Sequence, residues 1–161
     1  MEKAKYYAID IARFTVNFSH EIGIECSNLK LQKLLYFIQR AFIIVQDKPC
    51  FEEKIEAWAY GPVVPEVYQE FRKFGSSNIP KIECIVSVDL KTLTIKEENF
   101  DDNIISDDDK QIIKKVVDIY RDMSAISMAN LTHNQSPWKK SYIVGYNNEI
   151  PIELIKDSIK G

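Results

Sequence analysis

The sequence contains few of the residues that build disulfide frameworks, metal sites or catalytic centres. Its 161 residues include three cysteines, two histidines and five glycines. Cys26, Cys50 and Cys84 are odd in number and form no C-x-x-C pair, which argues against a disulfide framework or a cysteine zinc site. With so few glycines and 11% aromatic residues, the composition favours a well-packed globule over a disordered ligand.

Charge and hydropathy exclude further classes of protein. The formal charge is only −3, and no long run of lysine and arginine is present, so binding to nucleic acid or to an anionic membrane is not expected. No apolar run approaches the roughly 20 residues that span a bilayer, and the N-terminus lacks the apolar core of a signal peptide. We therefore expect a cytoplasmic protein.

Short motifs of the common enzyme classes are also missing. The sequence has no G-x-S-x-G, no G-x-x-x-x-G-K-[ST], no H-E-x-x-H and no G-x-G-x-x-G. We therefore expect neither an enzyme nor a bound cofactor or metal. A dispersed active site stays open as an alternative, because carboxylates such as Glu56 or Glu66 could meet His133 in space.

Apolar periodicity predicts a mainly α fold. A first helix has its apolar face at Tyr7, Ala8, Ile11, Phe14, Thr15, Phe18 and Ile22 and ends near Gly23. A second begins after Ser27 or Asn28 and buries Leu31, Leu34, Leu35, Ile38, Phe42 and Val45. Further helical patterns follow, so we expect a single domain over residues 1–161 with six or seven helices and a small β-hairpin.

The hairpin and the later helices have recognisable boundaries. Residues 82–88 and 92–95 are rich in β-branched side chains and flank a polar turn, which predicts two paired strands. A helix follows that Ser106 or Asp107 can cap, and we interpret the acidic run there partly as capping and partly as a solvated linker. Short helices are predicted from Ser124, from Ser136, where Pro137 takes the first helical position, and after Pro151.

The most unusual segment is residues 55–68, I-E-A-W-A-Y-G-P-V-V-P-E-V-Y, which we call the corner. Glycine tolerates unusual backbone angles and proline fixes φ, so a turn is predicted at Gly61-Pro62. Pro65 suits the first turn of a helix that ends at Gly75. Trp58 and Tyr60 flank the turn. Such rigid aromatic side chains are typical interface anchors, although simple core packing is the alternative, above all for Trp58.

Two other places offer binding chemistry. Lys30, Lys33, Phe37 and Arg40 recur at three- and four-residue steps on the second helix, and we expect them on the side away from the leucines, either as a charged interface or as a solvated face. His133 lies between Thr132 and Pro137-Trp138. Its ring can tie an interhelical turn together or contact a partner.

Three ordered motifs resemble the Panacea domain, the SocA-like antitoxin family that also occurs in phage-associated proteins. They are L-K-L-Q-K-L-L-Y-F from Leu29, the corner, and L-T-H-N-Q-S-P-W from Leu131. The resemblance covers nearly the whole chain. It implies an antitoxin that binds a cognate toxin directly, or alternatively an adaptor that delivers the toxin to the ClpXP protease. It makes no prediction of the oligomeric state.

From their residue types and expected positions, we divide the residues singled out above into two groups. The toxin-binding candidates are Lys30, Lys33, Phe37, Arg40, Tyr60, Tyr68 and His133. The residues expected to maintain the fold are Trp58, Gly61, Pro62, Pro65, Pro137 and Trp138.

Overall fold

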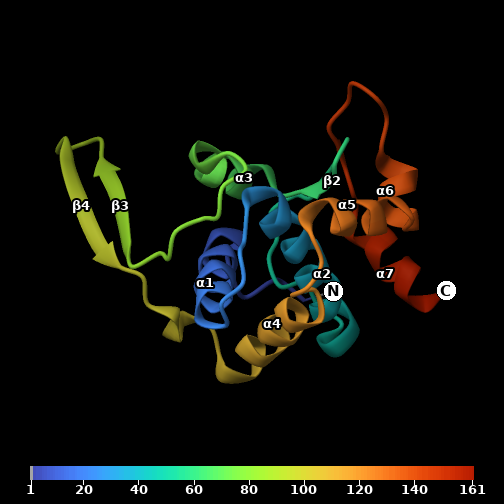
Figure 1. Ribbon diagram of the computed structural model, residues 1–161, viewed down its shortest axis with the longest axis horizontal. Helices are drawn as coiled ribbons and strands as arrows, with labels where there is room; N and C mark the ends of the chain where they lie inside the picture. Colours follow the sequence, from blue (N-terminus) through green and yellow to red (C-terminus); the bar gives the residue numbers. More distant parts are fainter. Residues whose placement is uncertain (1) are drawn as a thin grey trace.

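The computed structural model describes residues 2–161 and confirms a mainly α fold (Figure 1). Within this range there are seven α-helices, joined by five short strands and two 3-10 turns. The helices are α1 (Ala8–Glu21), α2 (Asn28–Gln46), α3 (Pro65–Phe71), α4 (Asp107–Ile119), α5 (Ala125–His133), α6 (Ser136–Ser141) and α7 (Ile152–Lys160). None of them is long and apolar enough to cross a membrane, so far as residues 2–161 are concerned.

Helix α2 lies at the centre of the helical body, where α1, α3, α4, α5, α7 and the strand β2 (Gly61–Val63) pack against it (Figure 1). It begins where predicted, because the Ser27 side chain accepts a hydrogen bond from the Lys30 N–H at 3.3 Å. Its buried side chains include the predicted Leu31, Leu34, Leu35, Ile38 and Phe42. The core therefore surrounds α2 instead of covering one face of it.

The predicted apolar faces of the first two helices are each wrong at one terminal residue. Tyr7 is 71% exposed because it is the N-cap residue of α1 and precedes the first buried turn. Val45 is 63% exposed because it lies in the last turn of α2, beyond the core. Gly23 follows α1 with φ of +74°, as expected for a helix stop that glycine favours.

The corner forms a small antiparallel sheet. Strand β1 (Glu56–Trp58) pairs with β2 (Gly61–Val63), and Ala57 lies opposite Pro62. Ala59 and Tyr60 make the turn, so the prediction that Gly61-Pro62 is the turn is wrong: both belong to β2. Strand β5 (Asn148–Glu149), which the sequence pattern does not predict, pairs with β1 from more than 80 residues away.

Helix α3 begins and ends as predicted. Pro65 occupies the first turn, where its missing N–H leaves no bond unmade. The 3-10 turn η1 (Arg72–Phe74) extends the helix to Gly75, whose φ is +57°. Val67 and Phe71 bury the inner side of the helix.

A second hairpin projects from the helical body (Figure 1). Strand β3 (Cys84–Asp89) pairs with β4 (Thr94–Asn99) and with no other described strand. This confirms the predicted hairpin, although both strands begin two residues later than expected and β4 ends four residues later.

The later helices show two differences from the predictions. Ser106 caps α4 as expected and η2 (Asp102–Ile104) precedes it, but Asp109 is only 1% exposed, so the acidic run is not entirely solvated. Its carboxylate accepts hydrogen bonds from Tyr6 and from Gln46. Helix α6 is capped by Gln135 without a side-chain bond, one residue earlier than the predicted cap.

Candidate partner-binding site at the corner

Helix α2 fixes the backbone of the corner with polar side chains. The amide oxygen of Gln32 accepts a hydrogen bond from the Val64 N–H at 2.9 Å, and the amide nitrogen of Asn28 donates to the Tyr68 carbonyl at 3.1 Å. Gln32 also donates to the Asn28 side chain at 2.9 Å. These bonds pair backbone groups at the start of α3 and within it, and they hold the corner at one position on α2.

Lys33 holds the corner from the side of α2. Its side chain is fully buried, and Nζ donates a hydrogen bond to the Pro62 carbonyl at 3.0 Å. No carboxylate lies within 4 Å of Nζ in the described part of the chain. Burial without an ion-pair partner lowers the pKa of Lys33 from 10.5 to about 7. Near neutral pH this amine is therefore an uncharged or half-charged structural group.

Gly61 is the point where α2, the corner and α5 approach most closely. Its φ is +99°, which side-chain-bearing residues rarely adopt. A β-carbon there would lie 2.7 Å from Thr132 Oγ1 and 2.8 Å from Lys33 Cε. Glycine is thus required both for backbone conformation and for space.

The third motif closes the corner from the other side. The indole N–H of Trp138 donates to the Trp58 carbonyl at 2.8 Å. The rings of His133 and Tyr142 pack against Trp138, with centroid distances of 4.1 and 4.5 Å. Pro137 is buried near the start of α6. The three sequence motifs therefore meet at a single place, and their shared function in the fold is to hold the β1–β2 hairpin.

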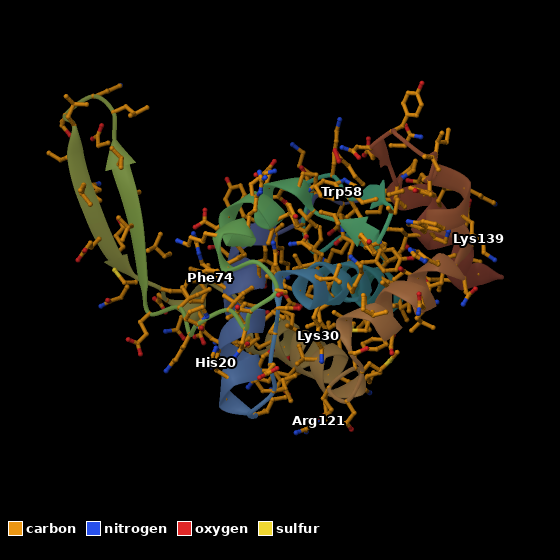
Figure 2. The ribbon with its side chains drawn as sticks, turned by 45° about the horizontal axis from the view of Figure 1, so that its top comes forward. His20, Lys30, Trp58, Phe74, Arg121 and Lys139 are labelled. Atoms are coloured by element: carbon orange, nitrogen blue, oxygen red, sulfur yellow. The ribbon has the colours of Figure 1, made fainter. Side chains whose placement is uncertain are left out.

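An open groove with a volume of about 420 Å³ lies on the outer side of the corner. Its lining includes Trp58, Tyr60, Val63 and Tyr68 from the corner and Leu29 from α2. The Trp58 and Tyr68 rings meet edge to face at 4.9 Å. Figure 2 shows Trp58 near the top of the helical body. The groove is therefore an aromatic surface on a backbone that hydrogen bonds from α2 and α6 hold in place.

The two aromatic candidates from the corner lie in this groove. Tyr60 is 66% exposed at the tip of the β1–β2 hairpin, and Tyr68 is partly buried beside it. Trp58 is also partly buried, and its indole N–H donates to Glu56 at 2.9 Å. Trp58 thus contributes to both the fold and the groove.

The prediction that the charged face of α2 is exposed is wrong. Lys30, Lys33 and Phe37 are buried, because α4 and α5 cover the side of α2 opposite the leucines. Lys30 Nζ donates to the Arg121 carbonyl at 3.1 Å, and burial lowers the pKa of Lys30. The Phe37 ring stacks on Tyr120 with centroids 4.3 Å apart.

Arg40 and His133 take intermediate positions. Both are partly buried. Among the described residues, Nε of Arg40 and Nε2 of His133 are each buried without a hydrogen-bond partner. Neither lines the corner groove. The structure therefore brings together only Tyr60 and Tyr68 of the seven predicted contact residues.

The sequence analysis missed two features at this end of the molecule. Asn28 and Gln32 are buried polar residues on a leucine-rich helix, and that pattern could have indicated their bonds to the corner. The loop after α6 exposes Ile143, Val144 and Tyr146 close to the groove, which Asn147 helps to line. Within residues 2–161, no three His, Cys, Asp or Glu side chains are grouped to hold a metal ion.

The fold is that of a small, mainly helical protein with an aromatic groove at the corner. Comparison with known proteins identifies the family: residues 31–139 match the SocA-like antitoxin family through its Panacea domain. The chain belongs to this family. The similarity to the antitoxin SocA of Caulobacter vibrioides is 39% identity over 71 residues, which is 44% of this chain and 36% of the relative. The aligned stretch thus spans about a third of that relative, and no solved structure matches the chain.

Proposed function

We propose that this protein is an antitoxin that neutralises a cognate toxin by binding it directly at the corner groove. Family membership supports a toxin partner. The observation that carries the proposal is Tyr60, 66% exposed at the tip of a hairpin whose backbone is bonded to α2 and to α6. An exposed aromatic side chain on a fixed backbone loses little conformational entropy on binding, which favours affinity.

The other predicted contact residues have different positions in this proposal. We assign Lys30, Lys33 and Phe37 to the support of the corner, because they are buried. Tyr60 and Tyr68 provide the aromatic anchor that protein interfaces commonly use. We further propose that neutralisation is stoichiometric binding without catalysis. Toxicity should then persist until the antitoxin reaches the molar amount that saturates the toxin, whereas an enzyme would protect at a small fraction of it.

The test compares two exposed tyrosines. We would co-express the chain with the small open reading frame that neighbours its gene, score growth, and measure Kd of the purified pair. Tyr60→Ala should weaken binding by about 30-fold, since truncating an aromatic hot spot costs about 2 kcal/mol or more. Tyr7→Ala is the matched control, because Tyr7 is 71% exposed and does not line the groove.

The outcomes separate the possible mechanisms. Equal Kd values for the two variants would remove the corner groove from the interface. Rescue of growth that requires ClpXP would instead support the adaptor mechanism. Failure of the wild-type chain to bind or neutralise the toxin would contradict the antitoxin proposal itself.

A further inference from the structure

The β3–β4 hairpin, which we call the arm, exposes an unusual amount of apolar surface. Val86, Val88 and Ile95 on its strands are 61%, 59% and 70% exposed, and Leu90 and Leu93 at its tip are each 81% exposed. Figure 2 shows the side chains of the arm standing clear of the body. Clustered exposed apolar residues mark a place where a protein meets a partner.

The strand register places three exposed apolar side chains of the strands on one side, whereas Ile85, opposite Glu98, lies on the other. Val88 lies directly opposite Ile95, and directly opposed residues point to the same face of a sheet. Val86 is two residues before Val88 and therefore shares that face. We call Val86, Val88 and Ile95 the arm face. Lys96 and Ser87, which are opposite each other, lie on the other face.

The arm is anchored at its base. The Asn17 side chain of α1 donates to the Ile82 carbonyl at 2.8 Å and accepts from the Ile82 N–H at 2.7 Å. Ile82 and Phe100, at the two ends of the arm, pack against the core. A two-stranded hairpin is only marginally stable by itself in water. The fixed base therefore presents a hairpin that would gain stability from a partner along its open face.

The arm and its base are acidic. Residues 82–102 include six acidic and two basic side chains, a formal charge of −4 in a chain whose total is −3, which leaves +1 for the rest. Two of these acids are near lysines, since Asp102 is 3.0 Å from Lys110 and Glu83 is 3.9 Å from Lys81. Glu97, opposite Val86 and therefore on the same side of the hairpin as the arm face, has no basic group within 4 Å among the described residues, and neither has Glu98 on the other side.

We propose that the arm face docks on the toxin, at an apolar strip flanked by basic residues. The inference rests on the proposed function for the identity of the partner. Charge complementarity favours such a partner, because attraction between opposite charges accelerates association and excludes like-charged surfaces. A second copy of this chain is disfavoured, since pairing two arms would bring two acidic segments together.

The experiment uses the full chain with three arm-face substitutions, Val86→Thr, Val88→Thr and Ile95→Thr. Threonine keeps the β-branched shape that strands favour while removing apolar surface. The matched control changes Ile44, Val45 and Ile119 to threonine, because these are aliphatic residues of the helical body with 52%, 63% and 62% exposure. We would measure Kd for the toxin at two salt concentrations and the sedimentation of each protein alone.

The arm-face variant should bind at least 10-fold more weakly, and the control variant should change less than twofold. Glu97→Lys with Glu98→Lys should slow association and reduce its salt dependence. Equal Kd values for the arm-face and control variants would overturn the inference and leave the proposed function standing. No binding by the wild-type chain would refute both. A wild-type dimer that the arm-face variant abolishes would assign the arm to a second copy instead.

Discussion

The pH dependence of stability offers a direct test of how Lys33 supports the corner. Lys33→Met removes the buried amine and keeps a chain of similar length. In the wild-type protein the pKa of Lys33 falls from 10.5 to about 7 because the ammonium group is buried. Between these two values the unfolded chain retains the proton and the folded chain releases it. The free energy of unfolding of the wild type should therefore rise with pH in this window.

The magnitude follows from the two pKa values. Integrating the difference in bound protons from pH 7 to pH 9 gives a gain of about 2 kcal/mol for the wild type relative to Lys33→Met. Below pH 6 both states of Lys33 are protonated, so the difference between the two proteins should stay constant there. At any single pH the difference in stability between the two proteins reflects two opposing effects. The substitution removes the buried amine, but it also leaves the Pro62 carbonyl without its hydrogen-bond donor.

The assay is urea unfolding from pH 5.5 to 9, followed by the fluorescence of Trp58 and Trp138. Other groups titrate in both proteins and cancel in the difference. Lys115→Met is the control, since Lys115 is exposed on α4 and the substitution leaves Lys33 in place, so this variant should retain the rise of stability with pH that Lys33 causes. Parallel stability curves for the wild type and Lys33→Met would show that Lys33 does not titrate in this range and would refute the reasoning.

Two further predictions concern the fold. Gly61→Ala should destabilise the protein by about 2 kcal/mol or more, because the added β-carbon would overlap Thr132 and Lys33. Gly23→Ala is the control and should cost only about 1 kcal/mol, because a β-carbon there would meet nothing within 4 Å. Thermal unfolding of both variants measures the difference. Asp109→Asn should flatten the loss of stability in acid. Burial raises the pKa of Asp109, but its hydrogen bonds outweigh this effect and hold the pKa below 3.8. The Asp109 carboxylate therefore adds to the free energy of unfolding above that value, and this contribution is lost as the pH falls. Equal loss of stability in acid for the two proteins would contradict this.

Local sequence determined the helices and their boundaries. Ser27, Ser106 and Ser124 each cap a helix through the side-chain oxygen, and this preference is legible without any tertiary contact. Pro65 at the start of α3 and Gly75 after η1 follow the same local rules. The motifs around these elements were also sufficient to predict the family that the comparisons show.

Only the tertiary structure decided which faces of α2 are exposed. Periodicity separates apolar from polar side chains, and it placed Lys30 and Lys33 outside. In the structure α4, α5 and the corner cover that side, and the two lysines donate hydrogen bonds to the carbonyls of Pro62 and Arg121. A long lysine side chain can act as a buried donor only where a backbone from far away in the chain meets it.

The same reason explains the corner. The sequence identified its residues and their rigidity but placed the turn two residues late, because Gly61 and Pro62 pair with Trp58 and Ala57 as part of β2, while β5, from the C-terminal part of the chain, pairs with the other edge of β1. Local propensity favours Gly61-Pro62 as a turn, whereas pairing with β1 and the close approach of Thr132 place them inside a strand. Local residue chemistry thus specified the elements, and contacts between distant segments decided which side chains are left for a partner.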